Sequence, residues 1–127
     1  VHDHWYGTPR QPLEQALLAG RDALLVIDVQ GAARIRRLIS QSGFDILKNA
    51  LVDIFILPPS LAILQERLIK RGQDSAASLQ RRLAGAAQEM ACRDQYRHVI
   101  INDQLEAAYA QLKKIIREEH TQPLGQR

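Results

Sequence analysis

The sequence has 127 residues, enough for one domain with a hydrophobic core and too few for two. Apolar residues make up 46% of the chain and charged residues 24%, and no run approaches the roughly 18 apolar residues that span a bilayer. The net charge of +3 is too small to indicate nucleic-acid binding, and the single cysteine excludes an internal disulfide. A globular domain in a reducing compartment, the cytoplasm, is expected.

The first half of the chain combines helical patterns with one strongly apolar run. Residues 23–27, Ala-Leu-Leu-Val-Ile, end at Asp28 and predict a strand buried on both faces. The remaining patterns of this half are helical and cover residues 12–18, 31–39 and 44–51.

The second half contains two further apolar runs, which predict buried strands over residues 52–57 and 98–101. Helices are expected from Ser60 to about Lys70, from Ser75 to about Tyr96 and from Leu105 to about Glu119. The alternation of apolar strands with helices predicts an α/β fold, in which a parallel sheet is covered by helices on both faces. Such sheets bind ligands at the carboxyl ends of their strands.

Two of the expected strands end in polar residues that could contact a ligand. Asp28 follows the first strand, where its carboxylate could accept hydrogen bonds from a ligand or simply cap the next helix. Asn102 and Asp103 follow the last strand, where a turn or a helix cap explains them equally well. The pattern leaves both alternatives open.

A cluster of basic residues lies between positions 67 and 82, and Asp74 opposes it. Its members are Arg67, Lys70, Arg71, Arg81 and Arg82. Guanidinium groups bind phosphate oxygens and stabilise the charge that develops during phosphoryl transfer. A solvated basic hairpin is the alternative interpretation. The sequence contains no Gly-Lys-Ser/Thr phosphate loop and no spacing typical of a metal site.

Together, these segments resemble the guanylate kinase family over about residues 1–118. The matching blocks, in chain order, are VH at 1–2, WYGTPR at 5–10, IDVQGA at 27–32, FILPPS at 55–60, RL at 67–68, RGQDS at 71–75, RL at 82–83 and IND at 101–103. The resemblance implies a fold like that of the P-loop nucleoside monophosphate kinases, with a helical lid. It implies transfer of the ATP γ-phosphoryl group to GMP or dGMP in purine nucleotide metabolism.

The resemblance also assigns roles to individual positions. Tyr6, Gly7, Thr8 and Asp28 are expected to bind GMP, whereas Arg67 and Asn102 are expected to bind ATP. Arg71 and Arg82 are expected to be the catalytic arginines of the lid. Mg²⁺ would accompany ATP, and neither nucleic acid nor a membrane is an expected partner. The implied division is the end of the GMP-binding lobe over 1–20, core over 21–66, lid over 67–85, and core with the C-terminal helix over 86–127.

Two departures from the family pattern bear on function. Val26 stands where family members usually carry an acidic residue. The phosphate loop of the family should precede Val1, so we expect the chain to be an N-terminally truncated part of a longer kinase and inactive alone. The alternative is a guanylate-kinase-like module that binds protein partners without catalysis. A small basic nucleic-acid binder is a third interpretation, which only the charge supports.

Overall fold

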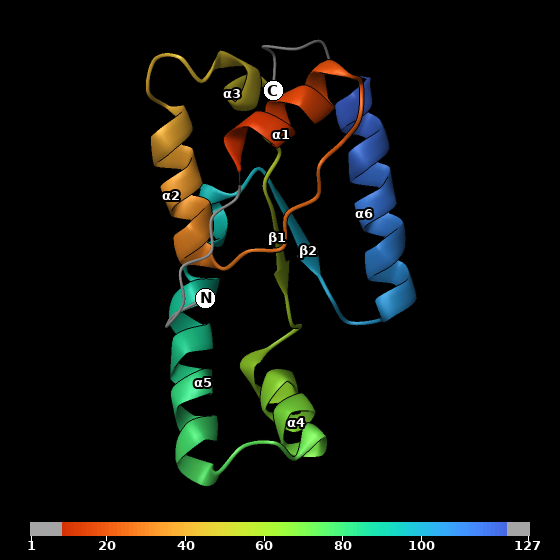
Figure 1. Cartoon of the computed structure of the whole chain (residues 1–127). Helices are drawn as coiled ribbons and strands as arrows, with labels where there is room; N and C mark the ends of the chain where they lie inside the picture. Colours follow the sequence, from red (N-terminus) through yellow and green to blue (C-terminus); the bar gives the residue numbers. More distant parts are fainter. Residues whose placement is uncertain (1–8, 122–127) are drawn as a thin grey trace. The chain divides into compact units, whose positions relative to one another are not determined.

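The computed structural model describes residues 9–121 (Figure 1). The chain separates into two compact units, the first ending at Leu51 and the second beginning at Val52. Each unit has its own set of contacts.

In the first unit, residues 9–51 form the helices α1 (Arg10–Leu18), α2 (Val29–Ile39) and α3 (Asp45–Ala50). Arg10 links the beginning of α1 to the segment before α3. Its guanidinium group lies 3.8 Å from the centre of the Phe44 ring and also binds Glu14 and the carbonyl of Gly43. A cation over an aromatic face is attracted by the ring's electrons, so this contact stabilises the packing of α1 beside α3.

The prediction of a strand over residues 23–27 is wrong. This segment forms neither a strand nor a helix, and the exposed fractions of Leu24 and Val26 are 79% and 93%. A β-strand exists only where a neighbouring strand takes up its backbone hydrogen bonds. Within residues 9–121 no strand pairs with this segment, so its apolar composition alone does not produce one.

The second unit contains a parallel sheet of two strands, β1 (Ile54–Leu57) and β2 (His98–Ile101), which lie side by side in Figure 1. Their register pairs Phe55 with Val99 and Ile56 with Ile100. Leu57 and Ile100 are almost fully buried and form the centre of the core. The parallel α/β class predicted from the sequence is therefore confirmed.

Four helical segments complete this unit: α4 (Leu61–Arg71), α5 (Ala76–Met90), the short 3-10 helix η1 (Arg93–Gln95) and α6 (Leu105–His120). We expected α5 to continue to Tyr96, but it ends at Met90. Beyond it the chain turns through η1, and the Tyr96 ring packs edge-on against Phe55 with ring centres 4.8 Å apart. A continuous helix could not deliver Tyr96 to the sheet in this way.

The C-terminal end of α6 is fixed to the sheet by a buried carboxylate. Glu119 Oε1 lies 2.8 Å from Arg97 Nε and 3.1 Å from His98 Nε2. Burial by itself raises the pKa of Glu119, but the hydrogen bonds and charges of His98 and Arg97 outweigh burial, and the net pKa lies below its ordinary value. Asp53 holds the same strand start by accepting a hydrogen bond from the Arg97 backbone N–H.

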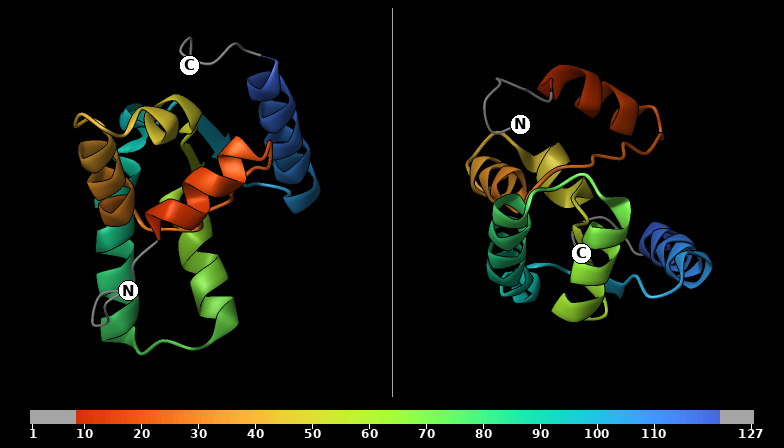
Figure 2. Two further views of the ribbon diagram at one scale, coloured as in Figure 1. Left: turned by 45° about the horizontal axis from the view of Figure 1, so that its top comes forward. Right: turned by 90° about the horizontal axis from the view of Figure 1, so that it is seen from below.

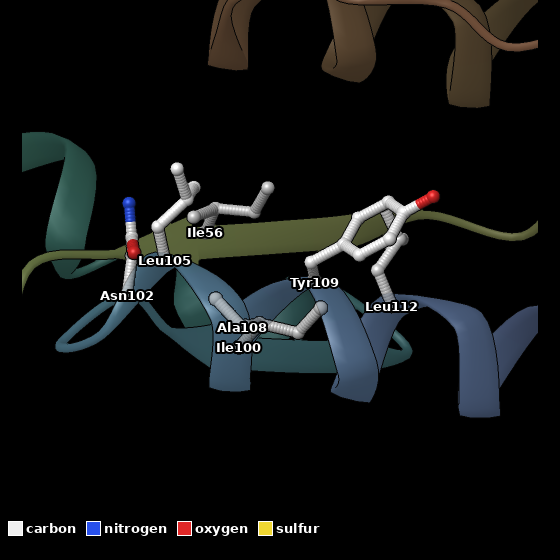
Figure 3. A pocket seen from close by; sticks show the side chains of 7 residues that line it. All are labelled: Ile56, Ile100, Asn102, Leu105, Ala108, Tyr109 and Leu112. Atoms are coloured by element: carbon white, nitrogen blue, oxygen red, sulfur yellow. The ribbon is translucent and has the colours of Figure 1, made fainter.

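An apolar pocket of about 140 Å³ lies between the sheet and α6 (Figure 3). Its lining consists of Ile56, Ile100, Asn102, Leu105, Ala108, Tyr109 and Leu112. None of the described residues that line it is charged, so this lining is unsuited to phosphate.

Candidate active site

The basic residues of positions 67–82 lie on a helical hairpin, which we call the arginine hairpin: α4, the loop over residues 72–75 and α5. The two helices lie side by side in both views of Figure 2 and are in contact. The Ser60 and Ser75 hydroxyls cap α4 and α5 by accepting hydrogen bonds from Ile63 N and Ser78 N. Gly72 ends α4 with φ of 69°, a left-handed conformation that favours glycine.

Arg67 connects the hairpin to the loop that follows β2. Its Nη1 donates a hydrogen bond of 2.9 Å to the Asn102 carbonyl, and its Nη2 donates one of 3.1 Å to the Asp103 carbonyl. The Asn102 N–H in turn donates to the Leu57 carbonyl at 2.7 Å. The structure therefore brings together Arg67 and Asn102, the two residues that the sequence assigned to ATP. It also shows that Arg67 uses both terminal amines on main-chain carbonyls.

Arg82 is held by a buried carboxylate within the hairpin itself. Its Nε lies 3.1 Å from Asp74 Oδ1, and the same oxygen accepts a hydrogen bond of 3.1 Å from the Ser78 hydroxyl. The Asp74 side chain is 6% exposed, whereas that of Arg82 is 51% exposed. The guanidinium group is thus anchored at its Nε edge while the rest of the side chain reaches solvent.

Arg71 is the last residue of α4 and is exposed. In the part of the chain that the structure describes, its guanidinium group forms no hydrogen bond or ion pair. A cation at this position interacts favourably with the negative end of the α4 dipole. Arg71 is therefore placed next to the loop of the hairpin with its guanidinium group able to bind an anion.

Asp28 caps α2 in the first unit. Its Oδ1 accepts a hydrogen bond of 2.7 Å from Gly31 N, which confirms the capping interpretation. A Cβ atom at position 31 would lie 3.1 Å from that oxygen, so glycine permits the close approach. The half-buried Asp28 lies in a different unit from the arginine hairpin.

The remaining expected GMP-binding residues, Tyr6, Gly7 and Thr8, lie outside the residues that the structure describes. Sequence reasoning placed Asp74 in the cluster only as an opposing charge and did not single out Ser78. A signal was present: Ser78 and Arg82 are four residues apart on one face of a helix, and Asp74, four residues before Ser78, comes just before that helix.

Two kinds of feature are absent from the described residues. Residues 9–121 contain no group of three or more His, Cys, Asp and Glu side chains arranged to hold a metal ion. Among the described helices, none combines the length and the apolar character needed to cross a membrane.

Comparison with known proteins identifies the relatives of this chain. The family model described as guanylate kinase matches residues 1–119. The chain belongs to the guanylate kinase family. The resemblance inferred from the sequence is thereby confirmed.

Guanylate kinases from several bacteria resemble the chain over most of its length. It is 46% identical over 115 residues to a guanylate kinase of Xylella fastidiosa strain 9a5c. The aligned residues make up 91% of the chain and 52% of the relative. It is 37% identical over 123 residues to a guanylate kinase of Carboxydothermus hydrogenoformans. Here the aligned residues make up 97% of the chain and 56% of the relative. The chain thus spans about half the length of the curated guanylate kinases it matches.

A solved guanylate kinase has a similar fold. The crystal structure of the guanylate kinase from Anaplasma phagocytophilum matches with a TM-score of 0.68 and 32% identity, over 90% of this chain and 50% of that one. This match supports the same parallel α/β fold class.

Proposed function

We propose that the complete protein containing this chain is a cytoplasmic guanylate kinase, which transfers the γ-phosphoryl group of ATP to GMP or dGMP and releases ADP and GDP or dGDP. The observation that carries the proposal is the arginine hairpin. Arg71 and Arg82 present guanidinium groups beside one loop, in a chain whose family phosphorylates nucleoside monophosphates. In-line phosphoryl transfer needs no protein nucleophile, because positioning and charge stabilisation supply the catalysis.

On the donor side, we assign ATP to Arg67 and Asn102. The terminal amines of Arg67 are occupied by the Asn102 and Asp103 carbonyls, so a phosphate cannot take the same bidentate position. These hydrogen bonds leave the flat faces of the guanidinium group unused, and a nucleotide base can stack on such a face. ATP would enter as its Mg²⁺ complex, in which the ion neutralises phosphate charge.

At the centre of the reaction, we assign charge stabilisation to Arg71 and Arg82. Both lie within the proposed lid, residues 67–85, which connects core segments over 21–66 and 86–127. Closure of such a lid excludes water, which otherwise accepts the phosphoryl group in place of GMP.

On the acceptor side, we assign GMP to Tyr6, Gly7, Thr8 and Asp28, with residues 1–20 as the end of the GMP-binding lobe. A tyrosine hydroxyl can donate a hydrogen bond to the GMP phosphate, and a carboxylate can accept hydrogen bonds from guanine. Asp28 already accepts from Gly31 N through Oδ1, and a carboxylate has further lone pairs for a base.

The proposal is tested by measuring ADP release from the complete gene product with MgATP and, in turn, GMP, AMP, CMP and UMP. We expect release that depends on GMP, at least about 100-fold faster than with AMP, because a site built around guanine leaves polar groups unpaired with adenine. A product that binds GMP without releasing ADP would favour the non-catalytic module, and one that ignores GMP would contradict the proposal.

The acceptor assignment has a test of its own. Tyr6→Phe removes one hydroxyl, so we expect the KM for GMP to rise by about tenfold to 100-fold, the effect of one lost hydrogen bond to a charged group, with kcat changed less. The measurement is the dependence of rate on GMP at saturating MgATP. An unchanged KM for GMP would remove Tyr6 from the site.

A further inference from the structure

Asp74 is buried without the usual reasons for burying a carboxylate at this place. It precedes α5, where aspartate commonly serves as a helix cap. Here the cap is provided by Ser75, whose hydroxyl accepts the hydrogen bond from Ser78 N. Asp74 is nevertheless only 6% exposed, and its Oδ2 is buried with no hydrogen-bond partner among the described residues. Capping therefore does not explain this side chain.

The contacts that Asp74 does make converge on Arg82. Its Oδ1 accepts the Ser78 hydroxyl at 3.1 Å and lies 3.1 Å from Arg82 Nε. Ser78 is itself half-buried, and its hydroxyl fixes the position of Oδ1 relative to α5. The carboxylate is thus held on one side by the helix and faces the guanidinium group on the other.

The edge of the guanidinium group that is engaged decides what the other edge can do. A guanidinium group has an Nε edge and, at its end, two amines that form a fork suited to phosphate oxygens. Arg82 forms its ion pair through Nε, and within residues 9–121 neither terminal amine makes a hydrogen bond. Its 51% exposed side chain therefore leaves the phosphate-binding fork available.

We propose that Asp74 is a positioning residue for Arg82: it holds the Nε edge so that the two terminal amines face the phosphoryl group in transfer. The inference rests on the proposed function, in which Arg82 touches that group. Holding an arginine in its reactive position before the substrate arrives removes the entropic cost of ordering it during the reaction.

The unpartnered Oδ2 of Asp74 is consistent with the same positioning role. A buried carboxylate oxygen without a partner is unfavourable, so its presence in a native protein needs an explanation, and a functional role is one. Because Oδ2 adds negative charge without a competing donor, it strengthens the attraction between the carboxylate and Arg82. The unpaired Oδ2 thus lowers the stability of the folded chain, while the carboxylate fixes the position of Arg82.

The test is a double-mutant cycle in the complete gene product, with Asp74→Asn, Arg82→Ala and the combined variant assayed with MgATP and GMP. Asp74→Asn keeps the shape and removes the charge, so we expect kcat to fall about tenfold while the KM for GMP stays within about twofold. If Asp74 acts through Arg82, the combined variant is no slower than Arg82→Ala alone. Multiplicative losses in the combined variant, or an unchanged kcat in Asp74→Asn, would overturn the inference.

Three further comparisons separate positioning from general effects. Glu89→Gln makes the same charge change at an exposed position of α5 and is expected to leave kcat unchanged. Asp74→Glu keeps the charge, so it should retain more activity than Asp74→Asn, and an equal loss would contradict the inference even if Asp74→Asn folds poorly. A wild-type kcat in Arg82→Ala would instead remove the catalytic assignment of Arg82, a failure of the proposed function that the cycle reports separately.

Discussion

Two arginines of the arginine hairpin, one on each helix, are held by opposite edges. Arg67 on α4 places both terminal amines on the main-chain carbonyls of Asn102 and Asp103. Arg82 on α5 is held through Nε by the buried carboxylate of Asp74. The residue type is the same, but the part of the guanidinium group that is available to a ligand differs: at Arg67 it is the flat face, and at Arg82 it is the pair of terminal amines.

This difference shows that a cluster of positive charge is not a uniform phosphate site. A neutral carbonyl pair fixes the plane of Arg67 without neutralising its charge, which suits contact with a base. A carboxylate at the far edge of Arg82 leaves the amines aimed away from it, which suits contact with phosphate oxygens. Substitutions of the two arginines are therefore expected to change different kinetic parameters.

The largest effect is expected at Arg82. Removing its guanidinium group with Arg82→Ala should lower kcat by at least about 100-fold, or about 2.7 kcal/mol of transition-state stabilisation, because the lost contacts are strongest when charge develops on the phosphoryl group. The measurement is kcat at saturating MgATP and GMP. A kcat within about threefold of wild type would remove Arg82 from the catalytic assignment.

A smaller effect, on a different parameter, is expected at Arg67. Arg67→Ala should raise the KM for MgATP about tenfold and lower kcat less, since stacking and loop positioning act on the bound donor rather than on the transition state alone. Arg67→Lys is the matched variant: lysine keeps the charge but lacks the planar guanidinium group that stacks on a base and donates through two amines, so it should behave more like alanine than like arginine. Recovery of the wild-type KM by lysine would show that charge alone matters.

The buried carboxylate of Glu119, in the same unit, should affect stability and leave kinetics unchanged. Its pKa in the folded chain is lowered from the ordinary value of 4.5, so its stabilising contribution is complete above that value and is lost as the pH falls through the lower, folded-state pKa. Glu119→Gln should destabilise by roughly 1–3 kcal/mol at pH 7 and by little well below pH 4.

Urea unfolding of wild type and Glu119→Gln between pH 3 and pH 7 measures this difference. A difference that stays constant over the range would contradict the assignment of the Arg97, His98 and Glu119 contacts to an ionised carboxylate. A changed kcat would show that this end of α6 communicates with the arginine hairpin.

The sequence was most informative where local chemistry determines structure. The strand over 98–101 and the serine caps of α4 and α5 were predicted correctly, because apolar β-branched runs and hydroxyl caps act over a few residues. The strand over 23–27 was not, although its composition resembles that of 52–57. Pairing with a neighbouring strand distinguishes the two, and that depends on residues distant in the chain.

The candidate site divides in the same way. The resemblance to the family identified Arg67, Arg71 and Arg82 as candidate site residues. The sequence pattern left Asp28 as either a ligand-binding residue or a helix cap. The carbonyl partners of Arg67 could not be predicted, because main-chain carbonyls leave no signature in a sequence. Asp74 has such a signature in its spacing to Ser78 and Arg82, but only the structure shows that its side chain is buried.

We propose that Arg82 uses both edges of its guanidinium group: Nε contacts Asp74, and the two terminal amines contact the transferring phosphoryl group. The most direct test is the single-turnover rate of phosphoryl transfer in Arg82→Lys, with MgATP and GMP saturating. Lysine keeps the charge but has one amine where arginine has two edges, so the account predicts a loss of at least about 30-fold, approaching that of alanine. A rate within about threefold of wild type would contradict it.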